Sequence, residues 1–326
     1  MKRFLVHILF FIIAAAMLYP PIVWLVGQST LQANVKYVPH NYGHSDLRME
    51  EADRLRLTEG PDLLFIGSSH CYRTFDTRVY DSCGYRSFNL GSSNQTPRQT
   101  YALLARYLQQ WSPQLVVIEV HPDIMGNSGE ESAVDIVSNT HIDAPIRDMA
   151  LSQHNLCVFN TMCCSFFDQL IRRNKNTRGD SIRNVSTRSG DTSVTVDFAY
   201  VKGGFVEVTP FRYKPIPLAS KAIEIRDDQL EWLGECLWLL NYHSTPYLLV
   251  EVPSTRGRYL SYTNHKEFEA KIRSLVDTDH EYLNLNEDRR LMSQLDDTTC
   301  FFDDDHLNQK GANIFNKFFT QCILSD

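Results

Sequence analysis

The sequence predicts a doubly wound α/β domain behind an N-terminal membrane helix. Short apolar runs without strict polar alternation are typical of strands buried on both faces of a parallel sheet, and amphipathic helical segments separate them. An apolar run at residues 4–26 predicts the membrane helix. With 326 residues and 43% apolar composition, the chain is long enough to bury a large core.

The N-terminal run is long enough to cross the roughly 30 Å of bilayer hydrocarbon. Residues 4–26 contain no Asp, Glu, Lys or Arg and a single histidine, His7, and they follow Lys2 and Arg3. The small residues Ala14–Ala16 leave a cleaved signal peptide as the alternative. The apolar run continues for ten residues beyond them, which favours an uncleaved anchor. In either case the basic residues predict a cytoplasmic N-terminus and an extracytoplasmic main domain.

We expect three parts in this single-pass membrane protein. Residues 1–27 form the cytoplasmic tip and transmembrane anchor, 28–58 a polar stalk, and 59–326 the extracytoplasmic domain. Without Lys2 and Arg3, 30 of the 32 basic residues remain against 39 acidic ones, a formal charge of −9. An acidic balance argues against nucleic acid as a partner.

Four strands and three helices follow in regular order. The strands are predicted at 62–68, 85–91, 113–120 and 246–252. One helix lies between the second and third strands, with Thr96 as its N-cap and Pro97 at its first position. A second helix at 227–243 precedes the fourth strand, and a last helix starts near Asn308. This alternation is that of an α/β domain with helices on both faces of the sheet.

An insertion at about 121–220 interrupts the alternation. It contains an apolar helical stretch at 145–173, a charged segment at 172–191 that we expect to be mobile, and a hairpin at 194–208 that turns at Gly203–Gly204. Insertions at the carboxyl edge of an open sheet shape the ligand site, so we expect this one to cap it.

Eight cysteines follow the anchor, and an extracytoplasmic location would permit disulfides. Their spacing contains no CxxC pair and no zinc-type pattern. Cys163 and Cys164 are adjacent on a predicted helix, which disfavours a regular framework of four bridges. We expect buried free thiols with one or two bridges.

A serine and a histidine far apart in the chain are the candidates for chemistry. Gly67, Ser68 and Ser69 end the first strand, where ligands bind in open α/β sheets. A serine needs a base, and His306 follows Asp303 by three residues, a spacing that lets the carboxylate orient the imidazole.

Neighbouring groups offer alternative roles. Asp304 and Asp305 are alternatives to Asp303 as the orienting carboxylate. We interpret His70 as structural, because a residue next to the nucleophile in a turn should point elsewhere, and Cys71 as a core residue. Asp303–Asp305 and His306 have ligand chemistry for a divalent cation, but no second ligand cluster accompanies them, so neither a metal nor a cofactor is expected.

These motifs resemble those of the SGNH/GDSL hydrolase superfamily, whose fold is a flavodoxin-like three-layer sandwich. Gly67-Ser68-Ser69 stands where the family has Gly-Asp-Ser, and Asp303 with His306 matches the last block, Asp-x-x-His. The glycine of the second block is Gly91 in "FNLGSSNQTP". The resemblance implies that Ser69 is the nucleophile, and that the N–H groups of Ser69 and Gly91 contribute to an oxyanion hole.

The chain departs from the family pattern in two places. Ser68 replaces the aspartate of the first block, a change that membrane-tethered members tolerate. The third block, Gly-x-Asn-Asp, is absent after the third strand, where the chain reads "IEVHPD". Asn94, Gln95 or His121 would then have to replace the missing asparagine in the oxyanion hole.

A tethered domain of this kind resembles proteins that O-acylate cell-wall or exported polysaccharides. The resemblance implies a serine acyl-esterase or O-acyltransferase that takes an acylated glycan or another acyl donor, with a membrane-bound O-acyltransferase as a partner. The alternative is a catalytically weak or inactive accessory protein that keeps the fold to bind glycan or that partner. The absent third block supports this alternative.

Overall fold

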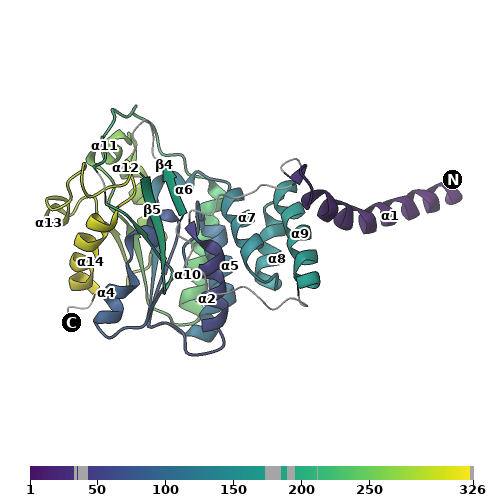
Figure 1. The fold of residues 1–326 in the computed structure, drawn as a ribbon, viewed down its shortest axis with the longest axis horizontal. Coiled ribbons are helices and arrows are strands. Elements are labelled where there is room, and N and C mark those ends of the chain that lie inside the picture. Colours follow the sequence, from purple (N-terminus) through teal and green to yellow (C-terminus); the bar gives the residue numbers. More distant parts are fainter. Residues whose placement is uncertain (33–34, 36–42, 173–184, 189–194, 211, 324–326) are drawn as a thin grey trace.

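The computed structural model describes residues 1–326 except 33–34, 36–42, 173–184, 189–194, 211 and 324–326. Its central sheet lies between two layers of helices (Figure 1). The sheet has five parallel strands in the order β2-β1-β3-β7-β8. The strands are β1 (Leu63–Ile66), β2 (Ser87–Asn89), β3 (Leu115–Glu119), β7 (Tyr247–Glu251) and β8 (Glu281–Asn284). Counted within this sheet alone the order is 2-1-3-4-5, the flavodoxin-like arrangement. The predicted fold class is confirmed.

The two faces of the sheet pack into separate cores. Leu64 and Ile66 of β1 face a core that is completed by α5 and α10, whereas Leu63 and Phe65 face one completed by α4 and α14. The bounds of these helices are Pro97–Trp111 (α5), Asp227–Tyr242 (α10), Thr77–Ser82 (α4) and Gln309–Ile323 (α14). Because both faces are covered, the strands are apolar without alternation.

The elements that the sequence analysis expected are present, and others lie between them. All four predicted strands occur, and α5, α10 and α14 are the three predicted helices. The edge strand β8 and the preceding α12 (His265–Arg273) were not predicted. β8 reads EYLN and is polar at both ends, and its first residue, Glu281, is exposed, so it lacks the apolar run of a central strand.

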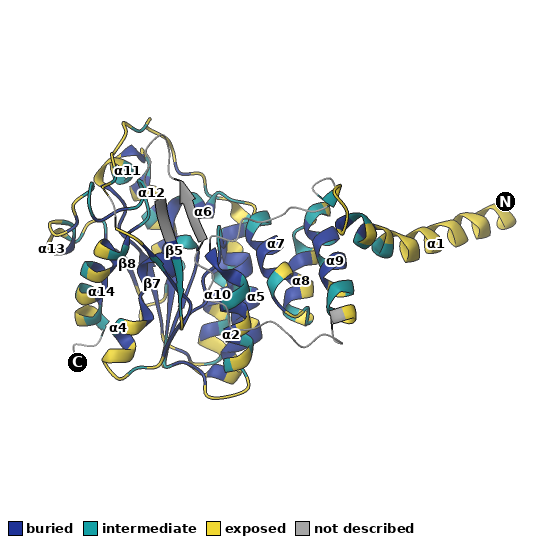
Figure 2. Ribbon diagram, viewed as in Figure 1, coloured by how far each residue is buried: buried dark blue, intermediate teal, exposed yellow. Residues whose placement is uncertain are grey.

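One helix in the described residues, α1 (Lys2–Gly27), is long and apolar enough to cross a membrane. Most of its surface is exposed (Figure 2). Its C-terminal half packs against α9 (Leu156–Arg172), where Tyr19 Oη donates to Asn160 Oδ1 at 2.8 Å and Trp24 Nε1 donates to Asp168 Oδ1 at 3.0 Å.

The stalk expected at 28–58 is shorter than predicted. Residues Ser45–Leu55 form α2, whose Met49 and Ala52 are buried in the core beside α5. The polar character of this segment suggested an exposed linker, but Met49 and Ala52 fall on one face of the helix and are buried. α2 therefore belongs to the globular domain.

The described residues of the insertion form four helices and a small antiparallel sheet. The predicted helical stretch at 145–173 is α8 (Ala144–Ser152) and α9, and α6 (Pro122–Met125) and α7 (Glu130–Asn139) precede it. The small sheet has the order β4-β5-β6, with bounds Val185–Arg188, Thr195–Val201 and Phe205–Val208. Most of the segment expected to be mobile, 172–191, lies outside the described residues.

The predicted hairpin is formed by β5 and β6, and it turns at Gly203 and Gly204, which both have positive φ. Its turn lies against the edge of the main sheet, because the Asn89 N–H at the end of β2 donates to Gly203 O at 2.7 Å. The hairpin is thereby fixed beside the carboxyl ends of β1 and β2.

All eight cysteines lie in the described part of the chain, and none is bonded to another. Cys71, Cys163, Cys164, Cys236 and Cys300 are buried. The expected buried thiols are present.

Candidate active site

Ser69 lies where β1 passes into α3 (Ser69–Thr74) at the carboxyl edge of the sheet. Ser68 is the N-cap of α3, and its Oγ accepts a hydrogen bond from the N–H of His70 at 3.2 Å. A serine is a favourable N-cap because its hydroxyl replaces a partner that the first turn lacks. The two serines therefore have different local roles: Ser68 caps the helix, and Ser69 is its first residue.

The structure brings Ser69 and His306 together across 237 residues of chain. Ser69 Oγ lies 2.8 Å from His306 Nε2. His306 belongs to a short loop before α14, and the buried Asn308 holds this loop by donating from Nδ2 to Thr299 O and Phe301 O at 3.0 and 3.1 Å. The separation is within hydrogen-bond reach of a nucleophile and its base.

Two carboxylates contact the other nitrogen of the imidazole. His306 Nδ1 lies 2.9 Å from Asp303 Oδ2 and 2.8 Å from Asp305 Oδ1. Asp303 Oδ1 also accepts from the N–H groups of Asp305 and His306, so it shapes the turn. Asp304 instead pairs with Arg258 of α11 (Arg256–Ser261). Of the three acids considered, Asp303 and Asp305 are in position to orient His306.

These charges determine the protonation of the imidazole. Burial lowers the pKa of His306, but Asp303 and Asp305 outweigh it and raise the pKa to about 10. Burial raises the pKa of Asp305, yet the charge of His306 prevails and holds it well below its usual value. At neutral pH the resting site therefore contains an imidazolium whose Nε2 donates to Ser69 Oγ.

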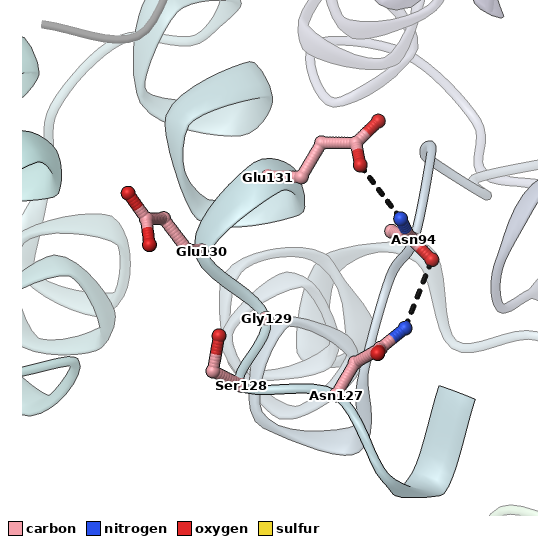
Figure 3. A pocket seen from close by; sticks show the side chains of 6 residues that line it. All are labelled: Asn94, Asn127, Ser128, Gly129, Glu130 and Glu131. Carbon is pink, nitrogen blue, oxygen red and sulfur yellow. Dashed lines mark hydrogen bonds between the residues drawn. The ribbon is translucent and has the colours of Figure 1, made fainter. Parts of the chain in front are cut away.

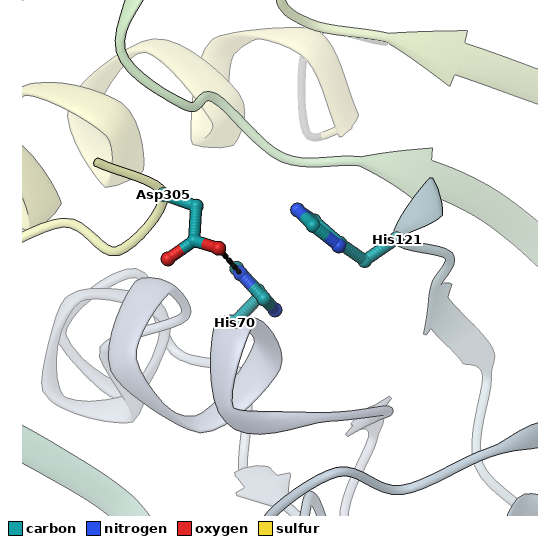
Figure 4. Close-up of side chains that lie close together, drawn as sticks. All are labelled: His70, His121 and Asp305. Carbon is teal, nitrogen blue, oxygen red and sulfur yellow. Dashed lines mark ion pairs between the residues drawn. The ribbon is translucent and has the colours of Figure 1, made fainter. Parts of the chain in front are cut away.

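Three imidazole rings form a stack beside Ser69, contrary to the expectation that His70 points elsewhere. His70 lies between His121 and His306, with ring centroids 3.8 and 4.2 Å away and planes within 8° of parallel. His70 Nε2 faces Asp305 Oδ2 at 3.6 Å (Figure 4). His70, which follows the candidate nucleophile, reaches the ring of His306 because α3 starts at Ser69 and turns its second residue toward the His306 loop.

His70, His121 and Asp305 place possible metal-ligand atoms within 4.8 Å of one another (Figure 4). A metal ion needs lone pairs that converge at about 2.1 Å from it. Imidazole lone pairs lie in the ring plane, and the stacked rings of His70 and His121 have centroids 3.8 Å apart and planes within 8° of parallel. The stack as it stands is a poor fit for a shared ion.

A buried chain of hydrogen bonds fixes His70 from the far side. His70 Nδ1 lies 2.9 Å from Ser68 Oγ, which donates to Glu119 Oε2 at 2.8 Å. Glu119 Oε2 also accepts from the Ser68 N–H at 2.7 Å. Sequence reasoning missed Glu119, although its position at the carboxyl end of β3, next to β1, was a usable signal. His121, which follows it, is kept neutral because burial lowers its pKa well below the usual value.

The predicted oxyanion-hole donors differ in availability. Among the described residues nothing accepts a hydrogen bond from the N–H of Ser69. Gly91 lies beside Ser68, since an added Cβ would meet Ser68 O at 3.0 Å, but its N–H donates to Asn89 Oδ1 at 3.1 Å. In this structure the expected donor of Gly91 is therefore engaged by Asn89.

Of the three residues suggested as substitutes for the missing third block, Asn94 and Gln95 are also engaged, and His121 Nδ1 accepts from the Asp123 N–H at 3.3 Å. Asn94 Nδ2 donates to Glu131 Oε2 at 2.6 Å, and Asn94 Oδ1 accepts from Asn127 Nδ2 at 3.0 Å (Figure 3). These residues line a cavity of about 350 Å³ at the start of α7. Gln95 donates to Thr100. The side-chain amides of Asn94 and Gln95 are thus directed to neighbours other than Ser69 in the described part of the chain.

Cys71 is a core residue, as expected. It is fully buried on α3 and contacts Asn89 Oδ1 through Sγ at 3.4 Å. Burial raises the pKa of its thiol well above the usual value. A thiol that stays protonated is a poor nucleophile.

No protein-family model matches the chain, and no curated protein matches it. Among solved structures the chain is similar to a protein from Bacteroides fragilis that is provisionally described as an acylhydrolase, with 10% identity and a TM-score of 0.39. The match covers 86% of this chain and 97% of that one. At this identity and TM-score the likeness carries no argument about chemistry.

Proposed function

We propose that the chain is a membrane-anchored, extracytoplasmic, SGNH-like serine acyl-esterase or O-acyltransferase that acts on acylated cell-surface or exported polysaccharide. The observation that carries the proposal is the 2.8 Å separation of Ser69 Oγ and His306 Nε2, with Asp303 and Asp305 at the opposite nitrogen. We infer polysaccharide as the substrate class from the resemblance of the sequence blocks to the superfamily and its tethered members.

In the proposed reaction, deprotonated His306 accepts the hydroxyl proton of Ser69 as Oγ attacks the ester carbonyl carbon. The N–H of Ser69 donates to the developing oxyanion. His306 then gives its proton to the departing sugar oxygen, which leaves Ser69 acylated. Water or a second sugar hydroxyl, deprotonated by His306, attacks the acyl carbon, and Ser69 recovers its proton as the acyl group leaves.

An accessory role is the second candidate, and the hydrogen bond between the Gly91 N–H and Asn89 favours it. One preorganised oxyanion donor contributes about 3 to 4 kcal/mol to acyl transfer. Two backbone donors were expected, the N–H groups of Ser69 and Gly91. If the Gly91 N–H stays bonded to Asn89, only the Ser69 N–H of this pair is free among the described residues. The enzyme would then be slow, or it would require a substrate that displaces Asn89.

The test compares acyl release with acyl transfer. The full chain in detergent micelles is incubated with an acetylated glycan, with and without an unacylated glycan acceptor, and acetate and acetylated acceptor are quantified. The transferase predicts that acceptor diverts acyl groups from water, whereas release unaffected by acceptor indicates an esterase. Turnover no greater than that of Ser69→Ala would contradict both and favour the accessory role.

A further inference from the structure

Arg73 shares the face of α3 on which Ser69 lies. The two residues are four positions apart, the spacing that places side chains above one another on a helix. The side chain of Arg73 is 9% exposed. A buried positive charge normally has a negatively charged partner, and this guanidinium lies one helical turn from the candidate nucleophile.

Aromatic rings surround the guanidinium. Its Cζ lies 5.1 Å from the ring centroid of Phe198, 5.4 Å from that of Phe302 and 5.7 Å from that of Tyr72. Phe198 comes from β5 of the insertion, and Phe302 donates its N–H to His306 O at 2.8 Å. The rings of Phe198 and Phe302 meet edge to face at 5.3 Å. Arg73 therefore lies where the insertion contacts the loop that carries His306.

No carboxylate pairs with Arg73 in the described part of the chain, and its Nε has no hydrogen-bond partner. Other buried arginines do have acids: Arg98 pairs with Asp228 at 2.7 Å and Arg106 with Asp53 at 2.9 Å. Arg48 also lacks an acid, but it is fully buried and donates to Gly204 O. Cation–π contacts replace part of the lost hydration, but they do not satisfy the N–H donors.

The charge of Arg73 affects the pKa of His306, the candidate base. Burial and Arg73 both lower the pKa of His306, against the larger raising effect of Asp303 and Asp305. This agrees with the position of Arg73 on the Ser69 face of α3 and beside Phe302.

We propose that Arg73 is an anion-binding subsite, which takes a carboxylate or phosphate group carried by the substrate close to the ester that Ser69 attacks. The inference rests on the proposed function and narrows its substrate to an acidic glycan. The planar guanidinium matches both oxyanion groups with two parallel hydrogen bonds. Phe198 and Phe302 exclude water from the ion pair, which strengthens it.

The experiment uses the full chain in detergent micelles and three acetylated sugars: glucose, glucuronate and glucose 6-phosphate. Acetate release gives kcat/KM for wild type, Arg73→Met, Arg73→Lys and the exposed control Arg290→Met. We expect the kcat/KM of wild type to be about tenfold or more higher on one of the two acetylated acidic sugars than on acetylglucose. Arg73→Met should lose this preference, because its kcat/KM falls more on the acidic sugar than on acetylglucose; Arg73→Lys should keep part of the preference, and Arg290→Met should match wild type.

The glucuronate and phosphate arms show which oxyanion group the subsite accepts. No preference in wild type, or an equal loss on all three sugars in both Arg73 variants, overturns the proposal. If wild type releases no acetate, the proposed function fails and the subsite is tested by binding alone. Equilibrium dialysis with Ser69→Ala should then show binding of glucuronate and glucose 6-phosphate. Arg73→Lys should weaken this binding, and Ser69→Ala/Arg73→Met should abolish it. Absence of binding to Ser69→Ala overturns the subsite as well.

Discussion

The imidazole ring of His70 lies face to face with that of His306, with centroids 4.2 Å apart and planes within 7° of parallel. His70 is itself fixed, because Ser68 links its Nδ1 to Glu119 at the end of β3. The ring of the candidate base therefore rests on a surface that is anchored to two central strands. This packing, together with the carboxylates at Nδ1, leaves the ring of His306 little freedom to turn away from Ser69.

The protonation of His306 predicts an alkaline pH optimum. Because its pKa is raised to about 10, the imidazole cannot accept the Ser69 proton at neutral pH, and the active fraction grows as pH rises toward that value. We expect kcat/KM for a neutral aryl acetate to increase from pH 6 to pH 9, since this parameter reports the free enzyme.

Removal of one carboxylate should shift that profile. Asp305→Asn eliminates a negative charge 2.8 Å from His306 Nδ1, so the pKa should fall by about one unit or more and activity at neutral pH should rise. Asp279→Asn, which removes an exposed acid in the turn between α12 and β8, is the control. Superimposable profiles for Asp305→Asn and wild type would rule out this electrostatic account.

The hairpin turn should be intolerant of a side chain at Gly204. This residue has a φ of +93°, and an added Cβ would come 2.0 Å from Asn89 O, a backbone atom that cannot move aside. Gly204→Ala should lower the midpoint of urea unfolding and loosen the insertion from β2.

A second glycine provides the matched control. Nothing lies within 4 Å of a Cβ added at Gly234 in the middle of α10, so Gly234→Ala should stabilise the protein by about 0.5 to 1 kcal/mol. Equal urea midpoints for Gly204→Ala and Gly234→Ala would show that the close approach to Asn89 does not govern stability.

The mature protein should retain α1. Hydrogen bonds from Tyr19 and Trp24 to α9 attach the end of this helix to the globular domain, as expected of a permanent anchor. Intact mass of the protein purified from its membrane should include residues 1–27, and alkaline carbonate should not extract it. A mass that begins after Ala16 would indicate a cleaved signal peptide instead.

The sequence was most informative about buried strands and local turns. Apolar runs identified four of the five strands because both faces of the sheet are covered, and the Asp303-x-x-His306 spacing predicted the turn in which Asp303 accepts the N–H of His306. Element order at the sheet edge suggested that Ser69 and His306 would meet.

Features that depend on tertiary contacts escaped prediction. The stack of His70 on His306 joins residues that are far apart in the sequence. The packing of Met49 on the core was missed because the segment around it is mostly polar. The bond from the Gly91 N–H to Asn89 depends on the path of one loop, so the identity of the glycine did not reveal the direction of its N–H. Arg73 follows Ser69 by four residues, but the sequence does not show that no acid among the described residues pairs with it.

The central claim is that His306 activates Ser69, and labelling with a fluorophosphonate probe tests it most directly. The full chain in detergent micelles is treated at pH 9 and the modified residue is located by peptide mass spectrometry. We predict that the probe attaches to Ser69 in wild type and in Ser68→Ala, and that His306→Gln and Ser69→Ala remain unlabelled. Folded wild type that takes up no probe, or that takes it up at another residue, would contradict the account.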